Sequence, residues 1–480
     1  MTHPVISLLL GPGRAQDVTT TLSTVRASAR QVEVLGPRTP DASTADELAA
    51  ALARASGRYV GVLEPGDLVE PGVLEAAVTY LTRHPDVDVL YTDEQWPGEG
   101  ASGIFTKPDW NPAYHVALGY LGRLCLVRRE LLQDAGGFLS GTEGVEERDA
   151  QLRVIERGAT VEHLPLVGVS RPHAPQPDPT ACVAAVERHL RRTGVDARVE
   201  AAEPPGGVRV RRAVPEPPTV SVVIPTAGTS REVRGERVRL VTRCVRSLVA
   251  TTDYPSWDVV LVTSEGTPPE AVDEVRAEAG DRLTVTHVAG DFNFSRSINE
   301  GVRVASGELV LLLNDDTEAD DPSWLRQMVA VEADPSVGVV GAKLVFADGR
   351  VQHLGVMHND VWEPSHPFMF ETDGTGHFGM GSLDLDYPAV TGACLLTSRR
   401  LFVDVGGLCT ALPLNYNDVD FCFKVRAAGR RVVVAPSVRL FHYESASRTA
   451  RVEQAERDFM VAHWRAEAYR DPFVQLRSVR

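Results

Sequence analysis

Apolar and polar positions follow two distinct periods along the second half of the chain. Continuous apolar runs typical of buried strands occupy residues 220–224, 258–263, 283–288 and 308–313. Between them, apolar residues recur at helical spacing, which predicts helices at about residues 237–250, 269–279 and 295–305. Strands that alternate with helices indicate a parallel sheet joined by crossovers, so this half is predicted to be an α/β domain.

The first half repeats this order of elements. Residues 5–10 and 57–63 are predicted strands, and residues 46–56 are a predicted helix. Further along, the Gly-Gly-Phe of residues 136–138 parallels the Gly-Gly-Leu of residues 406–408. We therefore predict two tandem domains of one α/β type, which implies a shared fold but not shared chemistry.

A Pro-rich passage separates the two halves. Residues 201–218 have a composition that is poor for a helix or a central strand, so we predict a linker there, with the junction near residue 215. This places a first domain at residues 1–200 and a second domain at residues 219–480.

Composition and charge limit the classes of function. A chain of 480 residues is long enough for two or three domains with real cores. A formal net charge of −16 argues against an extended nucleic-acid interface, which needs clustered Lys and Arg. The six cysteines form no CxxC pair, so neither a zinc site nor a disulfide framework is indicated. The N-terminus lacks the features of a signal peptide and no apolar run reaches about 18 residues, so we expect a cytoplasmic protein and leave peripheral membrane contact open.

Acidic residues directly follow the predicted strand at 308–313, in the order Asn314, Asp315, Asp316. Open α/β sheets bind ligands beyond the carboxyl ends of their strands. Adjacent carboxylates without a nearby Lys or Arg repel each other, and a hard divalent cation such as Mg²⁺ or Mn²⁺ relieves that repulsion. Acidic residues after a strand are also often solvated or cap a helix, so the run alone leaves both interpretations open.

Three later segments carry candidate chemistry. His442 follows the apolar run at 431–440, Asp418 and Asp420 begin a predicted helix, and residues 391–393 form a Thr-Gly-Ala turn. Residue type alone also permits a structural interpretation of each: a histidine that only supports the fold, carboxylates that cap a helix, and a closely packed turn.

The irregular region at 357–388 is long for a loop without secondary structure, which suggests a function. Its aromatic residues are suited either to stacking on sugar faces or to a local hydrophobic cluster. They are Trp362, His366 and Tyr387.

Several sequence blocks in one order resemble a known family. They are residues 220–226, 292–295 with Asn299, 307–318, 390–396, 405–407, 417–422 and 442–448. Together they make residues 219–448 similar to a family 2 glycosyltransferase with the GT-A fold, an enzyme that uses nucleotide-sugars. Residues 57–173 resemble a second, degenerate domain of the same family. The resemblance implies an α/β chain of two tandem GT-A-like (nucleotide-diphospho-sugar transferase, Rossmann-like) domains, the first degenerate.

The resemblance implies roles for the acidic run. Its residues occupy the family's DxD position, which implies Asp316 as a ligand of Mn²⁺ or Mg²⁺ and Asp315 as a contact to the ribose or a second metal contact. His442 lies where the family has a further metal ligand, and neutral imidazole suits Mn²⁺. The cation would stabilise the charge of the leaving diphosphate.

The resemblance also implies a catalytic base and an acceptor pocket. A base must take the proton of the acceptor hydroxyl, and we choose Asp418 over Asp420 for this role. Direct displacement from the face opposite the leaving nucleotide implies inversion. Thr391, Gly392 and Ala393 would line the acceptor pocket beneath the donor sugar. Further substrate contacts are expected from Pro225, Thr226, Asn299 and Asp420.

The nucleotide-base site departs from the family pattern. An Asp usually follows the second strand, but this chain has Thr263 there, so we expect Thr263 to hydrogen-bond the base and Glu265 to substitute for the missing charge. The choice between UDP- and dTDP-sugars stays open. Charged residues inserted at 231–237 are predicted to form a mobile loop over the nucleotide.

The leading hypothesis is a metal-dependent, inverting glycosyltransferase that moves a hexose or deoxyhexose to a glycan or lipid-linked acceptor in bacterial cell-surface polysaccharide synthesis. The alternative is a non-catalytic carbohydrate-binding or scaffold protein derived from such domains. In the first half, Glu64-Pro65-Gly66-Asp67 replaces the paired carboxylates, so we predict that residues 1–200 do not catalyse transfer. A nucleotidyltransferase is disfavoured because the second domain lacks an obvious basic, Gly-rich phosphate loop.

Overall fold

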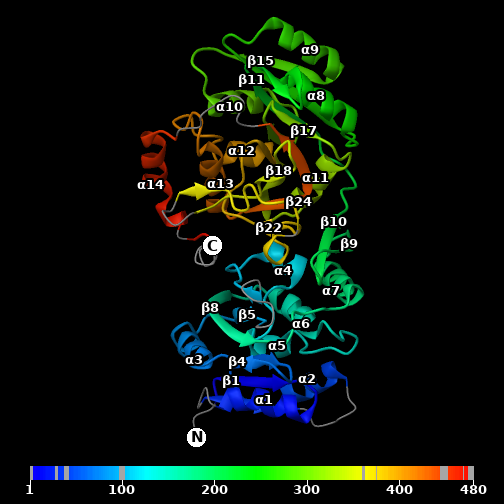
Figure 1. The fold of residues 1–480 in the computed structure, drawn as a ribbon, viewed down its shortest axis with the longest axis vertical. Coiled ribbons are helices and arrows are strands. Elements are labelled where there is room, and N and C mark those ends of the chain that lie inside the picture. The colour runs from blue at the N-terminus through cyan, green and yellow to red at the C-terminus, as the bar shows by residue number, and fades with distance from the viewer. Residues whose placement is uncertain are drawn as a thin grey trace. The chain divides into compact units, whose positions relative to one another are not determined.

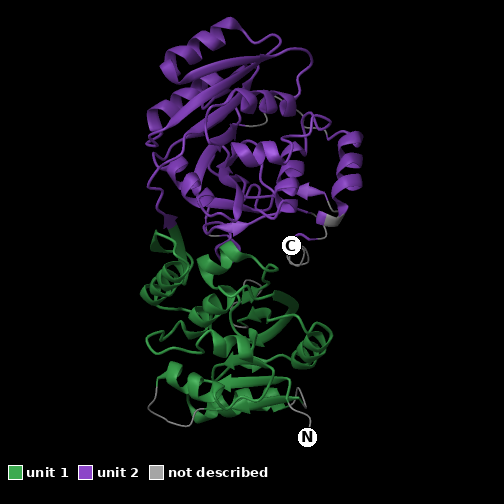
Figure 2. Ribbon diagram, turned by 180° about the vertical axis from the view of Figure 1, so that it is seen from behind, with its two compact units in different colours: residues 1–210, 475–480 green, residues 211–474 purple. Residues whose placement is uncertain are grey.

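The computed structural model describes residues 4–26, 31–36, 43–96, 103–358, 363–374, 376–443, 452–468 and 470–473. The chain divides into two compact units: residues 1–210 with 475–480 form unit 1, and residues 211–474 form unit 2 (Figure 2). Trp362 and residues 444–448 of the last resemblance block lie outside the described residues. No helix in the described ranges is both long and apolar enough to cross a membrane.

Unit 2 is built on a sheet of ten strands. Its main path runs in the order β15-β14-β11-β16-β23-β18-β24-β17. Neighbouring strands from β15 to β16 are parallel, and β23 then runs antiparallel to both β16 and β18. The strands of this path are β11 (Val220–Thr226), β14 (Trp257–Ser264), β15 (Leu283–Val288), β16 (Leu309–Leu313), β17 (Thr317–Ala319), β18 (Val337–Val345), β23 (Cys394–Ser398) and β24 (Arg431–His442).

Helices connect the parallel strands of unit 2 (Figure 1). Helix α8 (Leu240–Thr251) places Val241, Val245 and Leu248 in the core, as their helical spacing predicted. Every residue of β16 is buried, which is typical of a strand in a sheet covered on both faces. The other helices are α9 (Pro269–Ala279), α10 (Phe294–Val304), α11 (Trp324–Glu332), α12 (Arg399–Asp404), α13 (Asn417–Ala427) and α14 (Gln454–Ala468).

The charged insertion after β11 is a β-hairpin, and the helix predicted from about residue 237 begins only after it; the predicted mobility of residues 231–237 over the nucleotide stays a prediction. Strands β12 (Ser230–Val233) and β13 (Glu236–Arg239) pair antiparallel, and α8 begins only at Leu240. The two residues between the strands, Arg234 and Gly235, have φ values of 51° and 82°. A two-residue turn with positive φ at both positions matches the twist of a hairpin. Charge and polarity suggested a loop, but this turn geometry permits strands.

The Pro-rich passage also differs from the predicted linker. Strands β9 (Ala197–Ala202) and β10 (Gly207–Arg212) form a hairpin, and the prolines near residue 204 lie in its turn. Val199 and Val208 pack against Val186 and Leu190 of helix α7 (Pro179–Arg192) in a small core of their own. Outside this turn, the residues between β10 and β11 are the part of the passage without a helix or strand.

Unit 1 repeats the fold of unit 2 with one strand fewer on the main path. Its order, β2-β1-β3-β7-β5-β8-β4, matches the order of unit 2 from β14 to β17. Only helix α2 (Thr44–Leu52) connects β2 to β3, so unit 1 has no counterpart of β15 among its described residues. The predicted pair of related α/β domains is confirmed at the level of strand order. The strands are β1 (Ile6–Leu10), β2 (Val32–Leu35), β3 (Tyr59–Leu63), β4 (Leu68–Val69), β5 (Val89–Gln95), β7 (Leu126–Arg128) and β8 (Val161–Ser170).

Candidate active site

A cavity of about 720 Å³ lies in unit 2 beyond the carboxyl ends of β11 and β16. Its wall also includes the end of β24 and the start of α13. Most of the site residues predicted from the sequence line this cavity. They are Pro225, Thr226, Asp315, Asp316, Thr391, Gly392, Ala393, Asp418 and His442.

Asp316 and His442 meet at one side of this cavity. Strand β17 follows the acidic turn and pairs with the end of β24, with Thr317 opposite His442. This pairing brings Asp316 Oδ1 to 3.0 Å from His442 Nε2. Only 11% of the Asp316 side chain and 4% of the His442 side chain are exposed. Backbone pairing therefore holds two side chains from distant parts of the sequence in one buried contact.

Asp315 turns towards β11 instead. The Thr226 hydroxyl donates a hydrogen bond of 2.6 Å to Asp315 Oδ2, and the Gly228 amide donates to the Thr226 hydroxyl at 2.9 Å. The thiol of Cys244 contacts the backbone oxygen of Asn314 beneath the acidic turn. Burial raises the pKa of this thiol to about 12.

Asp316 and His442 are the residues that could hold a divalent cation. Adjacent ligands of a six-coordinate ion with bonds of about 2.1 Å lie about 3 Å apart, which agrees with the 3.0 Å between the two side chains. A carboxylate oxygen suits both Mn²⁺ and Mg²⁺, whereas an imidazole nitrogen favours Mn²⁺ over Mg²⁺. Within the described residues, no group of three or more His, Cys, Asp or Glu could hold a metal ion. Two side chains of the described residues are thus placed to contact a cation, and other ligands would have to come from phosphate oxygens or water.

Asp418 is held at the cavity by two backbone amides. Gly392 donates a hydrogen bond of 2.8 Å to Asp418 Oδ2, and Val419 donates one of 2.8 Å to Oδ1. Asp418 is the second residue of α13, which follows Tyr416 with a left-handed φ of 61°. The carboxylate is therefore oriented by the helix start on one side and by the turn at 391–393 on the other.

The structure places Asp420 outside the lining of the cavity. Its Oδ1 accepts a hydrogen bond of 2.8 Å from the Trp464 indole of α14, and its Oδ2 lies 2.8 Å from Lys424 Nζ. The side chain is buried between the two helices. This arrangement gives Asp420 a role in packing α14 and does not support the predicted substrate contact.

Three other predicted substrate residues also lie outside the lining of the cavity: Thr263, Glu265 and Asn299. The Thr263 hydroxyl lies 3.0 Å from His287 Nδ1 on the neighbouring strand, and Glu265 is exposed. The Asn299 side chain donates to the Leu408 carbonyl and accepts from the Leu408 amide, at 2.8 and 2.9 Å. Asn299 therefore joins α10 to the turn before residue 408 as a structural residue.

Sequence reasoning missed Gln352 and His353, which also line the cavity. They belong to the short strand β19 (Val351–His353), which pairs with β18. Both are buried, with 2% of each residue exposed. A Gln-His pair in an irregular region carries no motif. The only available signal was the position of two polar residues after an apolar strand and a turn.

Unit 1 has a counterpart of each position in this site, and strand register identifies it. Tyr59 pairs with Arg128 in unit 1, and Leu309 pairs with Ser398 in unit 2, so Tyr59 and Leu309 are equivalent positions. Five residues further along, Glu64 therefore takes the place of Asn314. The next two residues, Pro65 and Gly66, then replace Asp315 and Asp316. At the edge of the sheet, Leu68 pairs with Ser170 where Glu318 pairs with Phe441. Arg171 therefore occupies the position of His442.

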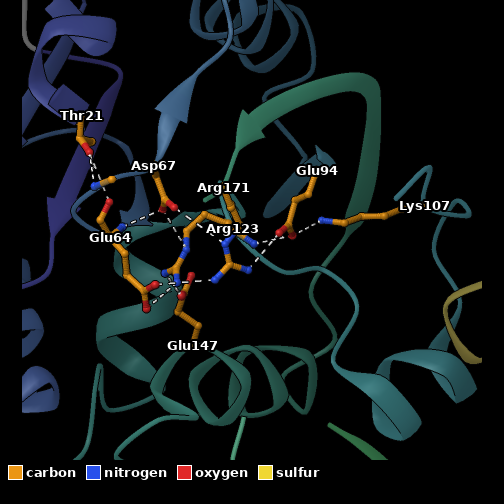
Figure 3. A network of polar contacts seen from close by, with 9 residues as sticks. Thr21, Glu64, Asp67, Glu94, Lys107, Arg123, Glu147 and Arg171 are labelled. Carbon is orange, nitrogen blue, oxygen red and sulfur yellow. Dashed lines mark hydrogen bonds and ion pairs between the residues drawn. The ribbon is translucent and has the colours of Figure 1, made fainter. Parts of the chain in front are cut away.

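Arginine side chains fill the counterpart site in unit 1 (Figure 3). Arg171 lies 3.6 Å from Glu64, 3.8 Å from Asp67 and 3.2 Å from Glu94. Arg123 lies 2.7 Å from Glu64 and 3.3 Å from Asp67. Only 5% of the Arg123 and 13% of the Arg171 side chain are exposed. Two guanidinium groups thus lie where the second unit has its candidate metal ligands and cavity.

A third contact of Arg123 completes the comparison. Arg123 pairs with Glu147, the second residue of helix α6 (Glu146–Ile155). Asp418 is likewise the second residue of α13, so Glu147 is its counterpart in unit 1. Burial raises the pKa of Glu147 to about 7, although Arg123 acts in the opposite direction. The counterpart of the candidate base is therefore engaged by a protein cation.

Comparison with known proteins shows two kinds of similarity. Residues 217–460 match the model described as "Glycosyltransferase like family 2". The "Uncharacterized protein y4gI" of Sinorhizobium fredii is 33% identical over an alignment of 445 residues, and the match covers 87% of this chain and 48% of that protein. The "O-antigen biosynthesis protein RfbC" of Myxococcus xanthus is 34% identical over an alignment of 411 residues, and the match covers 82% of this chain and 31% of that protein. The chain thus spans about half or less of the length of these curated relatives.

Among solved structures, the chain resembles GalNAc-T7 with UDP, GalNAc and Mn²⁺, at 14% identity and a TM-score of 0.40. That match covers 52% of this chain and 50% of the other. The mannosyltransferase PcManGT of Pyrobaculum calidifontis, in complex with GDP-Man and Mn²⁺, matches at 20% identity and a TM-score of 0.35. It covers 55% of this chain and 69% of the other.

Proposed function

The chain belongs to glycosyltransferase-like family 2, and from this membership we propose that unit 2 transfers a sugar from a nucleoside diphosphate donor to a hydroxyl of an acceptor. The observation that carries the proposal is the position of the Asp316–His442 pair and Asp418 in the wall of one cavity. The Asp316–His442 pair suits a diphosphate with its cation, and Asp418 suits an acceptor hydroxyl that must lose its proton.

Asp418 acts as the general base in this proposal. The acceptor oxygen forms a bond to the anomeric carbon, the bond from that carbon to the diphosphate oxygen breaks, and the hydroxyl proton moves to Asp418. Attack from the face opposite the leaving group inverts the configuration. The amides of Gly392 and Val419 hold the carboxylate in place while it accepts the proton.

Asp316 and His442 would hold the divalent cation, Mn²⁺ or Mg²⁺. When bound there, the cation supplies positive charge that offsets the negative charge of the leaving diphosphate. Asp315, fixed by the Thr226 hydroxyl, lies beside this pair and is suited to a contact with the ribose of a UDP- or dTDP-sugar. Asp315 and Asp316, which lie in the turn after β16, thus serve the donor end of the cavity together with His442.

The acceptor is proposed to be a glycan or a lipid-linked sugar in bacterial cell-surface polysaccharide synthesis. The Myxococcus xanthus relative is named as an O-antigen biosynthesis protein, and the match to it includes 82% of this chain. We place the reaction in the cytoplasm, with peripheral contact to the membrane for a lipid-linked acceptor. Unit 1 is proposed to be non-catalytic because Arg123 and Arg171 fill the counterpart site.

A donor screen tests the proposal. The full chain is incubated with UDP- and dTDP-sugars, a glycan acceptor, and Mn²⁺ or Mg²⁺, and nucleotide release is measured. We expect release with at least one donor, and we expect EDTA to abolish it. Failure of every donor to bind or react in the presence of either metal would count against a transferase and favour the non-catalytic alternative.

A further inference from the structure

We infer that Gln352 and His353, adjacent on β19, are positioning residues for the two chemically different sides of the cavity. Gln352 orients His442 on the metal side, and His353 orients the turn that holds Asp418 on the base side. The inference rests on the proposed function for its kinetic part only, because the contacts themselves are independent of any reaction.

Gln352 fixes which nitrogen of His442 faces Asp316. Gln352 Oε1 lies 2.6 Å from His442 Nδ1. An amide oxygen only accepts hydrogen bonds, so Nδ1 carries a proton, and Nε2 is the nitrogen that would offer its lone pair to a cation when the ring is neutral. The amide group of Asn314, 3.3 Å from Nε2, is a donor that suits the same tautomer. Partners of this kind orient metal-binding histidines and raise their affinity for the ion.

His353 is held in the opposite tautomer by two backbone amides. Gly355 and Thr391 donate to His353 Nε2 at 3.2 and 3.3 Å, so Nε2 is unprotonated. The proton then lies on Nδ1, which is 2.9 Å from His366 Nδ1 and donates to it. Burial, with the nearby His366 and His442, lowers the pKa of His353 well below its usual range. The ring therefore stays neutral and remains an acceptor.

The turn at 391–393 connects three elements through three consecutive residues. The Thr391 amide donates to His353, and the Gly392 amide donates to Asp418 at 2.8 Å. The Ala393 carbonyl accepts from the Asn314 amide at 3.1 Å. A shift of Thr391 therefore moves the group that holds the base. In the proposal, His353 acts through its contact with the Thr391 amide and does not contact the substrate.

The side chains of neighbouring residues on a strand point to opposite faces, which explains how adjacent positions serve different sides of one cavity. Substitution of one position should leave the other side intact. This separation makes the inference sharper than a general claim that β19 supports the site.

Leucine substitutions in the full chain test the two roles separately. Gln352→Leu should weaken the binding of Mn²⁺ alone by about tenfold or more, measured from the electron paramagnetic resonance signal of free Mn²⁺. Its kcat at saturating Mn²⁺ should stay near the wild-type value. His353→Leu should lower kcat by about a hundredfold, with Mn²⁺ affinity and the donor KM unchanged.

Conservative variants and a matched control exclude a merely structural explanation. Gln352→Glu keeps an acceptor oxygen and should restore Mn²⁺ binding, and His353→Gln supplies an acceptor oxygen in place of the ring nitrogen and should restore kcat. His358 is another buried histidine, bonded to Asp471 rather than to the turn. His358→Leu should lower thermal stability without the loss of kcat seen for His353→Leu.

Two outcomes would overturn the inference: unchanged Mn²⁺ affinity in Gln352→Leu, or equal losses of kcat in His353→Leu and His358→Leu. A wild-type chain that transfers no sugar contradicts the proposed function instead. In that case Mn²⁺ binding still decides the role of Gln352. Deuterium exchange of the peptide containing residues 391–393 decides the role of His353, because His353→Leu must speed its exchange and His358→Leu must not.

Discussion

Asp316 and Asp418 line one cavity but have different neighbours, and these neighbours decide what each carboxylate can do. Asp316 faces a ring nitrogen of His442 at 3.0 Å, an arrangement that suits a shared cation. Asp418 instead accepts two backbone amide hydrogens and keeps its oxygens at the cavity wall. In the proposed function, these different partners suit Asp316 to metal binding and Asp418 to proton transfer.

Asp316→Asn is expected to abolish detectable Mn²⁺ binding. The substitution removes the negative charge from one of the two proposed ligands, which lie 3.0 Å apart. Titration of Mn²⁺ with the full chain measures the loss. Asp320→Asn is the control, since the exposed Asp320 is 2.8 Å from Arg439. Equal Mn²⁺ affinity in wild type and Asp316→Asn would contradict the assignment of this ligand.

The limits of sequence reasoning are clearest for single residues. Asp316, Asp418 and His442 were predicted because each lies in a block that resembles the family, and the structure brings them to one cavity. Asp420 was predicted from the same block as Asp418, yet its carboxylate accepts a hydrogen bond from Trp464. The direction of a side chain depends on tertiary packing, which a motif does not contain.

At the scale of elements, periodicity predicted the parallel strands and helices of unit 2 and missed the hairpins. Strands β11, β14 and β16 are buried, and their continuous apolar sequences indicate this burial directly. Hairpin β12–β13 is largely exposed and charged, so its strands carry no apolar signal. Its stability comes from the turn and from contacts with distant residues, and local sequence does not show these.

Arg234 at the tip of this hairpin anchors it to the strand that carries His442. Its guanidinium lies 4.4 Å from the ring centroid of Phe441 and 3.8 Å from the Glu318 carboxylate. The residues that flank the hairpin, Thr229 and Leu240, line the cavity. The tip contact therefore links the position of the hairpin to one wall of the cavity.

Arg234→Ala is expected to raise the donor KM several-fold with little change in kcat, because the wall near the donor end loses its anchor. The free energy of unfolding should fall by about 1 kcal/mol at most, as for other partly exposed cation–π contacts. Steady-state kinetics with varied donor measure the effect. Arg237→Ala, an exposed arginine on β13, is the control. An unchanged donor KM in Arg234→Ala would show that the anchor does not serve the donor.

At the scale of the whole molecule, the chain contains one fold twice, with different contents in the equivalent sites. Unit 2 has a cavity with a carboxylate and a histidine, and unit 1 has an ion-pair network in the same place. The sequence indicated the duplication and the loss of paired carboxylates. It did not indicate the arginines, because the register that aligns Arg171 with His442 comes from strand pairing.

Arg171→Met should move the acid unfolding of unit 1 to higher pH. Burial alone would raise the pKa of Glu94, but Lys107 and Arg171 hold it below its ordinary value of 4.5. A carboxylate whose pKa is lower in the folded than in the unfolded state stabilises the fold at pH values above the unfolded-state pKa. This stabilisation is lost as the pH falls through the folded-state pKa. Without Arg171 the folded pKa rises, so protonation disrupts the network earlier.

Deuterium exchange of unit 1 peptides across a pH series measures this shift. Arg128→Met is the control, since Arg128 pairs with Asp88 at 2.6 Å outside the network. Both variants should bind Mn²⁺ like the wild type. An identical acid midpoint for Arg171→Met and wild type would show that the network contributes no pH-dependent stability.

The comparison of wild type with Asp418→Asn tests the central claim most directly. Nucleotide release is measured for both proteins with the same donor, acceptor and saturating Mn²⁺. Loss of the general base should lower the rate by about 10²- to 10⁴-fold, with unchanged Mn²⁺ binding. A variant that releases nucleotide as fast as the wild type would contradict the assignment of unit 2 as a transferase that uses Asp418 as its base.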